Sequence, residues 1–222
     1  MLSAIYSRSL ACLGCLLAFA FPAPASDVEK REFSILIDGK ESGTSRMVVT
    51  VQDDGTTVMQ GNCVVKFAKL LFSHSFEIES TEWWKDGKLI ALKSKATENG
   101  KKFDVSAAAD AKGIRLKING DDRLAAADAW TTSYWKLADA RFHNKAVPLL
   151  DPQDGKEYKG ELKYVATESI LIGKAPQQCY RFRISGGPQT TDLWYDRYHR
   201  LVREEFAELG HKIIVQLNSI QR

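Results

Sequence analysis

The sequence lacks the residue groupings that mark most reactive or metal-binding sites. Its 222 residues include 4 histidines, and none of these has another histidine or an acid at the spacing of zinc ligands. No Gly-x-Ser-x-Gly segment is present, so the strained turn that carries the nucleophile of many serine hydrolases is missing. We therefore expect no metal site and no cofactor.

Charge of one sign is nowhere concentrated. The chain has 31 Lys and Arg against 28 Asp and Glu, a formal net charge of +3, and the two signs are interleaved along its length. Binding of nucleic acid needs a basic patch or stripe, so we expect no nucleic-acid partner. A small basic group surrounds the Asn99-Gly100 pair and fits a solvated sheet edge better than a membrane contact; its members are Lys93, Lys95, Lys101 and Lys102.

Long apolar runs are missing from all but the N-terminal part of the chain. Residues 10–21 are almost entirely apolar, Arg8 precedes them, and Ala23 and Ala25 form a small-x-small pattern before Ser26. This arrangement is typical of a secretory signal, whereas a membrane helix needs about 20 apolar residues. We expect residues 1–25 to be a signal peptide cleaved near Ala25/Ser26. Residues 26–222 would then be a single exported domain, periplasmic or extracellular, with no transmembrane span.

Cysteine is scarce once that segment is set aside. Cys12 and Cys15 fall within the signal, which leaves Cys63 and Cys179. An oxidising compartment favours a disulfide between them. The alternation of their strands, however, places Cys63 on a core-facing side and Cys179 on the other face of its strand, in phase with Arg181. This favours two separate thiols, and the possible disulfide stays open.

What the chain does have is alternation with a period of two. Apolar and polar residues alternate through residues 32–38, 46–52, 114–119, 180–184 and 212–217. This pattern is typical of antiparallel strands with one buried face, and frequent Asp-Gly and Asn-Gly pairs supply the positive φ of tight hairpins. We predict an all-β fold: a large curved antiparallel meander of roughly a dozen strands, half-barrel or barrel-like, because a flat sheet of that size is unstable.

Residues 121–153 interrupt this pattern. The alanine-rich segment Leu124–Trp130 predicts one short helical crossover around residues 124–136. Loops of this length are often lids or binding elements. The structural alternative, which we favour, is a crossover that plugs the open end of the curled sheet.

Five tryptophans are many for this length. Each has a large apolar body and one N–H that needs a partner, so packing in the core and at the end of the sheet accounts for most of them. The functional alternative is an aromatic-lined cleft for an apolar or sugar-like ligand. The candidate ligand-binding residues are then Trp84, Trp130, Tyr134, Trp135, Trp194 and His74.

Two sets of polar residues support a weaker hydrolase hypothesis. His74 and Glu82 share one strand face and could form an acid/base pair. Ser133, Asp139 and His143 could be arranged as a triad. A histidine inside a sheet is more often hydrogen-bonded and structural, so we assign no catalytic residue.

Several turn and tryptophan motifs extend over nearly the whole chain. They are Ile37-Asp38-Gly39-Lys40 with Gly43-Thr44, Glu82–Leu89, Glu98–Lys101, Thr132–Trp135, and Asp192–Asp196 with Arg200-Leu201-Val202. Together they resemble a family of exported bacterial proteins known as domain of unknown function 6134. The resemblance implies an envelope location and an all-β fold, and no activity, cofactor or catalytic residue. The curved sheet expected for this family is similar to the sheets of periplasmic lipoprotein carriers, whose concave face holds acyl chains.

These observations give an order of hypotheses for function. The first is a non-catalytic binding or carrier module for an apolar, lipid-like ligand. The second is a structural domain of the envelope that binds a protein partner, and the third is a hydrolase.

Overall fold

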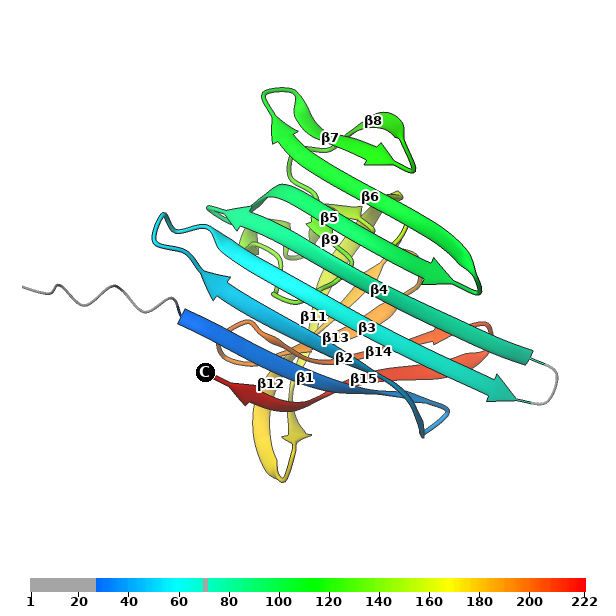
Figure 1. Cartoon of the computed structure of the whole chain (residues 1–222). Helices are drawn as coiled ribbons and strands as arrows, with labels where there is room; N and C mark the ends of the chain where they lie inside the picture. Colours follow the sequence, from blue (N-terminus) through cyan, green and yellow to red (C-terminus); the bar gives the residue numbers. More distant parts are fainter. Residues whose placement is uncertain (1–26, 70–71) are drawn as a thin grey trace, which may run out of the picture.

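A computed structural model describes residues 27–69 and 72–222, and these residues form one large curved sheet (Figure 1). The all-β prediction is confirmed: the described residues hold fifteen strands and a single 3-10 turn. In chain order the elements are β1 (Asp27–Ile37), β2 (Lys40–Val51), β3 (Thr57–Lys69), β4 (Phe72–Lys85), β5 (Lys88–Glu98), β6 (Lys101–Asp110), β7 (Gly113–Ile118), β8 (Asp121–Ala125), β9 (Trp130–Thr131), η1 (Ala140–Phe142), β10 (Lys145–Leu150), β11 (Glu157–Ile172), β12 (Ala175–Ser185), β13 (Thr191–Tyr195), β14 (Leu201–Glu208) and β15 (His211–Gln221).

The expected signal peptide, residues 1–25, and its cleavage position lie outside the described residues. Within the described part of the chain, no helix has the length and apolarity needed to cross a membrane.

The sheet is organised around a seam between its first and last strands. β1 pairs antiparallel with β15, from Lys30 opposite Gln221 to Ile37 opposite Ile213. From this seam one arm runs from β2 to β8, and a second arm runs from β14 back to β9. Most neighbours in each arm are also consecutive in the chain, so a tight turn is enough to join them. Asp38, Asp86, Asn99 and Asn119 adopt the positive φ that their Asp-Gly and Asn-Gly pairs predict.

The sheet curls because its long strands carry bulges. Register shifts occur within β1, at Trp83/Trp84 in β4, at Tyr164/Ala166 in β11 and at Trp194/Tyr195 in β13. A bulge bends its strand and increases the local twist. The second arm therefore passes behind the first (Figure 1), and the inward faces of the two arms meet.

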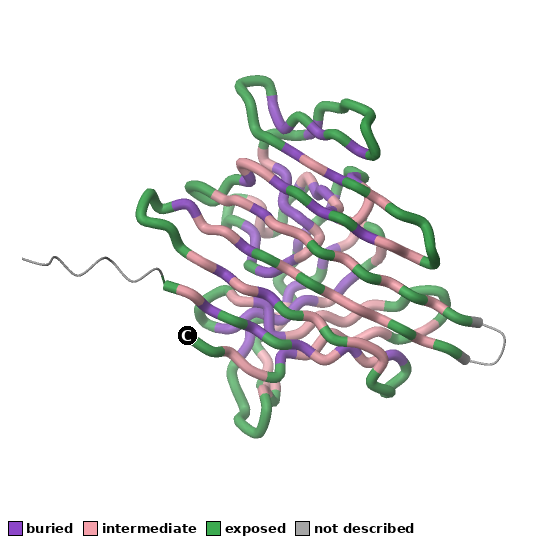
Figure 2. Tube along the Cα trace, viewed as in Figure 1, coloured by how far each residue is buried: buried purple, intermediate pink, exposed green. Residues whose placement is uncertain are grey.

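Three clusters of buried apolar side chains form the core, most of them on the inward faces of the two arms. The first joins β10–β14, the second joins β5–β8, and the third joins β1–β3 with β12–β15. Along the strands, buried residues alternate with exposed ones (Figure 2). The crossover contributes Trp130 and Tyr134 to the first cluster, Ala129 to the second and Trp135 to the third. It therefore packs between the two arms, which supports its interpretation as an internal plug.

The helix predicted around residues 124–136 is not formed. β8 ends at Ala125, and β9 pairs in parallel with β10, Trp130 opposite Leu149 and Thr131 opposite Leu150. The 3-10 turn lies further along, at Ala140–Phe142. A run of a few alanines is too short to sustain a helix in isolation, and burial of Trp130 and Thr131 against β10 decides the conformation.

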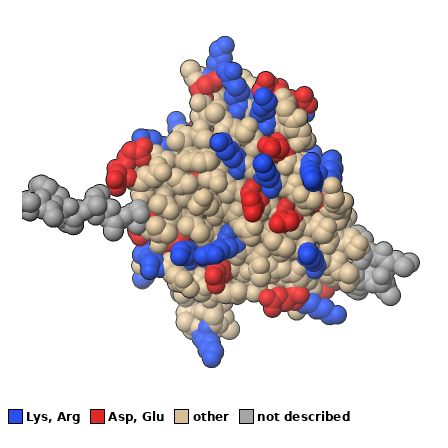
Figure 3. Space-filling model, viewed as in Figure 1, with Lys and Arg blue, Asp and Glu red and all other residues tan. Residues whose placement is uncertain are grey.

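The outer face of the first arm carries interleaved charges of both signs (Figure 3). Lys95 on β5 lies directly opposite Glu79 on β4. The basic group predicted around the Asn99-Gly100 turn is divided between two faces: Lys93 and Lys95 line a shallow outer groove, whereas Lys101 lines the interior. The solvated sheet edge expected from the sequence is therefore not found, because β5 and β6 are paired on both sides and the edge strands are β8 and β9.

Candidate ligand-binding cavity

A half-open cavity of about 600 Å³ lies between the two arms. Binding sites for small molecules typically measure about 300–1,000 Å³. The apolar floor comes from β1–β4 and β15. The other walls come from β14, the crossover and the turn that follows β10. Apolar side chains lining the floor include Ile35, Met47, Met59, Val65, Phe76, Ile78, Ile213 and Val215.

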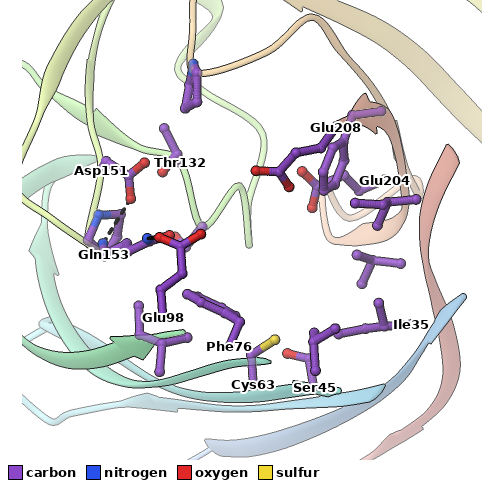
Figure 4. A pocket seen from close by; sticks show the side chains of 18 of the residues that line it. Ile35, Ser45, Cys63, Phe76, Glu98, Thr132, Asp151, Gln153, Glu204 and Glu208 are labelled. Atoms are coloured by element: carbon purple, nitrogen blue, oxygen red, sulfur yellow. Dashed lines mark hydrogen bonds between the residues drawn. The ribbon is translucent and has the colours of Figure 1, made fainter. Parts of the chain in front are cut away.

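A hydrogen-bonded polar group occupies one side of the cavity (Figure 4). The side-chain amide of Gln153 donates to Glu98 Oε2 at 2.8 Å, and the backbone N–H of Gln153 donates to Asp151 Oδ1 at 2.8 Å. Burial raises the pKa of Asp151 to about 6 in spite of these bonds. This side is thus acidic and already largely satisfied by its own partners.

The opposite side presents the carboxyl groups of Glu204 and Glu208, which point into the open space (Figure 4). Glu204 lies on β14 between Leu193 of β13 and Val215 of β15. Its surroundings are apolar, and desolvation raises its pKa to about 8. Among the described residues, none donates a hydrogen bond to this carboxyl group.

Two further polar groups border the cavity near Glu204. The Tyr134 side chain is 2% exposed, and its hydroxyl has no hydrogen-bond partner among the described residues. The thiol of Cys63 has its pKa raised to about 12 by burial and, to a lesser extent, by the charge of Glu204. At neutral pH this thiol is protonated and therefore a weak nucleophile.

Two of the six residues predicted to bind a ligand line the cavity: Tyr134 and His74. The other four are tryptophans that do not line it. Trp130 is buried in the first cluster and donates its N–H to Lys136 O at 3.1 Å. Trp135 is buried in the third cluster, with the Arg31 guanidinium 5.9 Å from its ring centre.

The remaining two tryptophans, Trp84 and Trp194, are also held by contacts within the protein. Trp84 packs against all three clusters and donates to Glu82 Oε2 at 2.9 Å. Trp194 lies on the other face of the sheet, where it donates to Glu168 Oε2 at 2.8 Å and stacks near Arg181 and Arg203. The aromatic side chains that do line the cavity are mainly phenylalanines rather than tryptophans: Phe67, Phe76, Phe103 and Phe206.

The residue sets of the hydrolase hypothesis are not brought together. His74 and Glu82 are separated by about 26 Å of extended strand, at about 3.3 Å per residue. His74 Nδ1 lies 3.2 Å from the Asn99 amide, whereas Glu82 is bonded to Trp84 and Thr131.

The Ser133, Asp139 and His143 side chains also have separate partners. Ser133 Oγ lies 2.8 Å from Thr131 Oγ1, Asp139 Oδ1 accepts from the Arg141 backbone N–H, and His143 Nε2 lies 3.1 Å from Ala138 O. No triad is assembled by these three side chains.

Cys63 and Cys179 are both free thiols. Cys63 faces the interior as predicted. Cys179 lies on the other face of β12, in phase with Arg181 as predicted, but this part of that face is covered, and the side chain is fully buried in the third cluster. The twisted β11–β12 hairpin lays this face against β15, where Gln216 Nε2 donates to Leu171 O at 3.4 Å. Partly buried Ile170 and Ile172 pack there as well.

The crossover is anchored beside the cavity by a fully buried carboxyl group, Glu82. Its Oε2 accepts from Thr131 Oγ1 at 2.9 Å as well as from Trp84, and burial raises its pKa. Replacing Thr131 with valine keeps the shape and removes one donor, so we expect the free energy of unfolding to fall by about 1–3 kcal/mol. Urea unfolding measures this change. Thr81→Val, next to Glu82 but on the opposite face of β4, is the matched control, and an equal loss in both variants would contradict the anchor.

No cluster of three or more His, Cys, Asp or Glu side chains that could hold a metal ion occurs within residues 27–69 and 72–222.

Comparison with known proteins gives a family and a fold. The family model described as "Domain of unknown function (DUF6134)" matches residues 33–218, and no curated protein matches the chain. Among solved structures, a beta-barrel-like protein of domain of unknown function DUF1849 from Brucella abortus aligns with a TM-score of 0.63 and 8% identity. The alignment covers 87% of this chain and 97% of that one. At this identity the likeness shows the fold alone.

Proposed function

We propose that this chain, which belongs to the DUF6134 family of unknown function, binds a small and largely apolar ligand without transforming it. We place this activity in the bacterial envelope, because the N-terminal 25 residues have the pattern of a secretory signal.

The observation that carries the proposal is the cavity between the two arms. A volume of about 600 Å³, an apolar floor and a few converging polar groups are the features of a small-molecule site. A core built only for stability is filled by its side chains. The interior of this sheet is instead left open beside Glu204 (Figure 4).

The chemistry of the lining supports binding rather than catalysis. The Cys63 thiol, with a pKa of about 12, is a poor nucleophile. Asp151 is occupied by Gln153, and the nearby hydroxyl of Thr132 serves the same carboxyl group.

Filling the cavity tests the proposal. Ser45 and Thr44 are neighbours on β2: Ser45, opposite Cys63, lines the cavity, and Thr44 points to the other face. We expect Ser45→Trp to weaken binding of a neutral apolar dye such as N-phenyl-1-naphthylamine at least about tenfold, a loss of 1.4 kcal/mol. Thr44→Trp should change it less than about twofold. Dye fluorescence measures both affinities, and thermal unfolding checks that both variants fold. Equal affinities, or no dye binding by the unmodified protein, would refute the proposal.

A further inference from the structure

We infer that the ligand carries a positively charged amine or ammonium group on its apolar body, and that the Glu204 carboxyl receives this group inside the cavity. The inference rests on the proposed function and narrows it to one chemical class of ligand.

The first observation is that Glu204 lacks the partners that the other interior carboxyl groups have. Glu29 accepts from Arg31 and Arg200, and Glu82 accepts from Trp84 and Thr131. Among the described residues no donor reaches Glu204, although the group sits on the inward face of β14 and borders the cavity. Glu204 is only partly buried, and its carboxyl group points into the cavity (Figure 4), so a donor carried by a ligand can reach it.

A second observation comes from the crossover. Tyr134 lines the same cavity, its side chain is 2% exposed, and its buried hydroxyl oxygen has no partner in the described part of the chain. Burial raises the pKa of Tyr134, and the charge of Glu204 is the next cause, so the two groups act on one another. An ammonium group has three donors, enough to bond the carboxylate and leave donors for further acceptors around it.

The charge of the lining selects the same class. Lys156 is neutralised by Asp154, with Nζ 2.7 Å from Oδ2, and Lys101 lies over the Phe103 ring at 4.8 Å. The acidic side chains of the lining outnumber its two lysines. An anionic amphiphile such as a fatty acid would therefore meet like charge in the cavity. Rings on the floor and walls can also attract a cation through their faces. The acids of the lining are Glu98, Asp151, Asp154, Glu204 and Glu208.

The surroundings of Glu204 predict how binding depends on pH. Tyr134, Tyr195 and Cys63 are the titratable groups on which its charge acts; His74, His211, Asp151 and Glu208 also line the cavity. In the empty cavity the carboxyl is mostly protonated at pH 6, because its pKa is about 8. A cationic amine that pairs with the carboxylate must release that proton, so its affinity should rise between pH 6 and 8. A neutral ligand should show no such rise.

The test compares three probes with one shared alkyl chain: dodecylamine, dodecanol and dodecanoate. Each displaces the bound dye below its micellar concentration. We expect the amine to bind at least about tenfold more tightly than the alcohol, and the carboxylate to bind least tightly. Glu204→Gln should bring the amine to within about threefold of the alcohol while the alcohol keeps its affinity. Glu205→Gln is the matched control, because Glu205 lies on the opposite face of β14 with Arg203 and Lys212.

The outcomes separate this inference from the proposed function. Failure of the dye and all three probes to bind refutes the proposed function. Binding of all three with similar affinities, or a Glu204→Gln protein that keeps the preference for the amine, refutes the inference and leaves the proposed function standing. Tightest binding of dodecanoate would also overturn it, since a protonated Glu204 would then be a donor to a carboxylate. Should Glu204→Gln fail to fold, the absence of a pH-dependent rise specific to the amine in the unmodified protein would refute it.

Discussion

Replacing Glu29 with alanine is expected to lower the free energy of unfolding by about 3–5 kcal/mol, because it leaves a buried arginine without its carboxylate. Arg31 is 3% exposed, and its Nε donates to Glu29 Oε1 at 2.7 Å. Glu29 Oε2 also accepts from Arg200 at 2.8 Å and from Arg222 at 3.1 Å. One carboxyl group thus joins β1, the start of β14 and the chain after β15.

Urea unfolding measures this loss, and Glu32→Ala is its control, because Glu32 is an exposed glutamate on the same strand. Glu29→Gln should lose less than Glu29→Ala, since the amide keeps one acceptor oxygen. Burial alone would raise the pKa of Glu29, but the bonds from Arg31 and Arg200 hold it below its ordinary value. The stabilisation is therefore lost as the pH falls through that lowered pKa. Losses of similar size in the Glu29→Ala and Glu32→Ala proteins would contradict this account.

Replacing Glu204 with glutamine is expected to remove a large part of the pH dependence of stability. The pKa of Glu204 is raised from 4.5 to about 8, so between these values the folded state binds more protons than the unfolded chain. Stability must then fall as the pH rises. At about 1.36 kcal/mol per pKa unit, the full loss is at most about 5 kcal/mol. Glutamine does not titrate, so the variant should match the original protein near pH 4.5 and exceed it by several kcal/mol near pH 9.

The measurement is the difference in unfolding free energy between the two proteins over this pH range. Asp151, whose pKa is also raised, contributes equally to both and cancels in the difference. Glu205→Gln should show the opposite trend, because Lys212 and Arg203 outweigh burial and lower the pKa of Glu205. A difference that stays constant with pH would show that Glu204 is as well solvated in the folded state as in the unfolded chain.

The sequence contained most of the fold because its signals are local. Alternation sets which face of a strand is buried, and pairs such as Asp38-Gly39 and Asn99-Gly100 set the turns, whose positive φ the structure confirms. The pairing of β1 with β15 is not local, and no short-range pattern reveals it. The alanine-rich segment around residues 124–130 was misread because helix propensity is weak against burial of Trp130 by tertiary contacts.

The candidate site was only partly visible for a similar reason. Tyr134 and His74 were recognised, whereas Glu204 was not, because Arg203, Glu204 and Glu205 read as a solvated charged run. Only its register, between Leu193 and Val215, shows that the middle residue faces inward. The tryptophans were predicted to line a ligand site, but they do not line the cavity. The N–H groups of Trp84, Trp130 and Trp194 each have a protein partner, so these rings serve packing.

The pairing of β1 with β15 also determines the stage of folding at which the cavity can form. Each arm consists mainly of hairpins between consecutive strands, which can form as soon as both strands have emerged. The arms share no hydrogen-bonded edge until β15, the final strand in chain order, lies between β1 and β14. A nascent chain that still lacks β15 would expose both inward faces to solvent. Those faces therefore need protection from aggregation during the last stage of synthesis, until β15 has paired with β1 and β14.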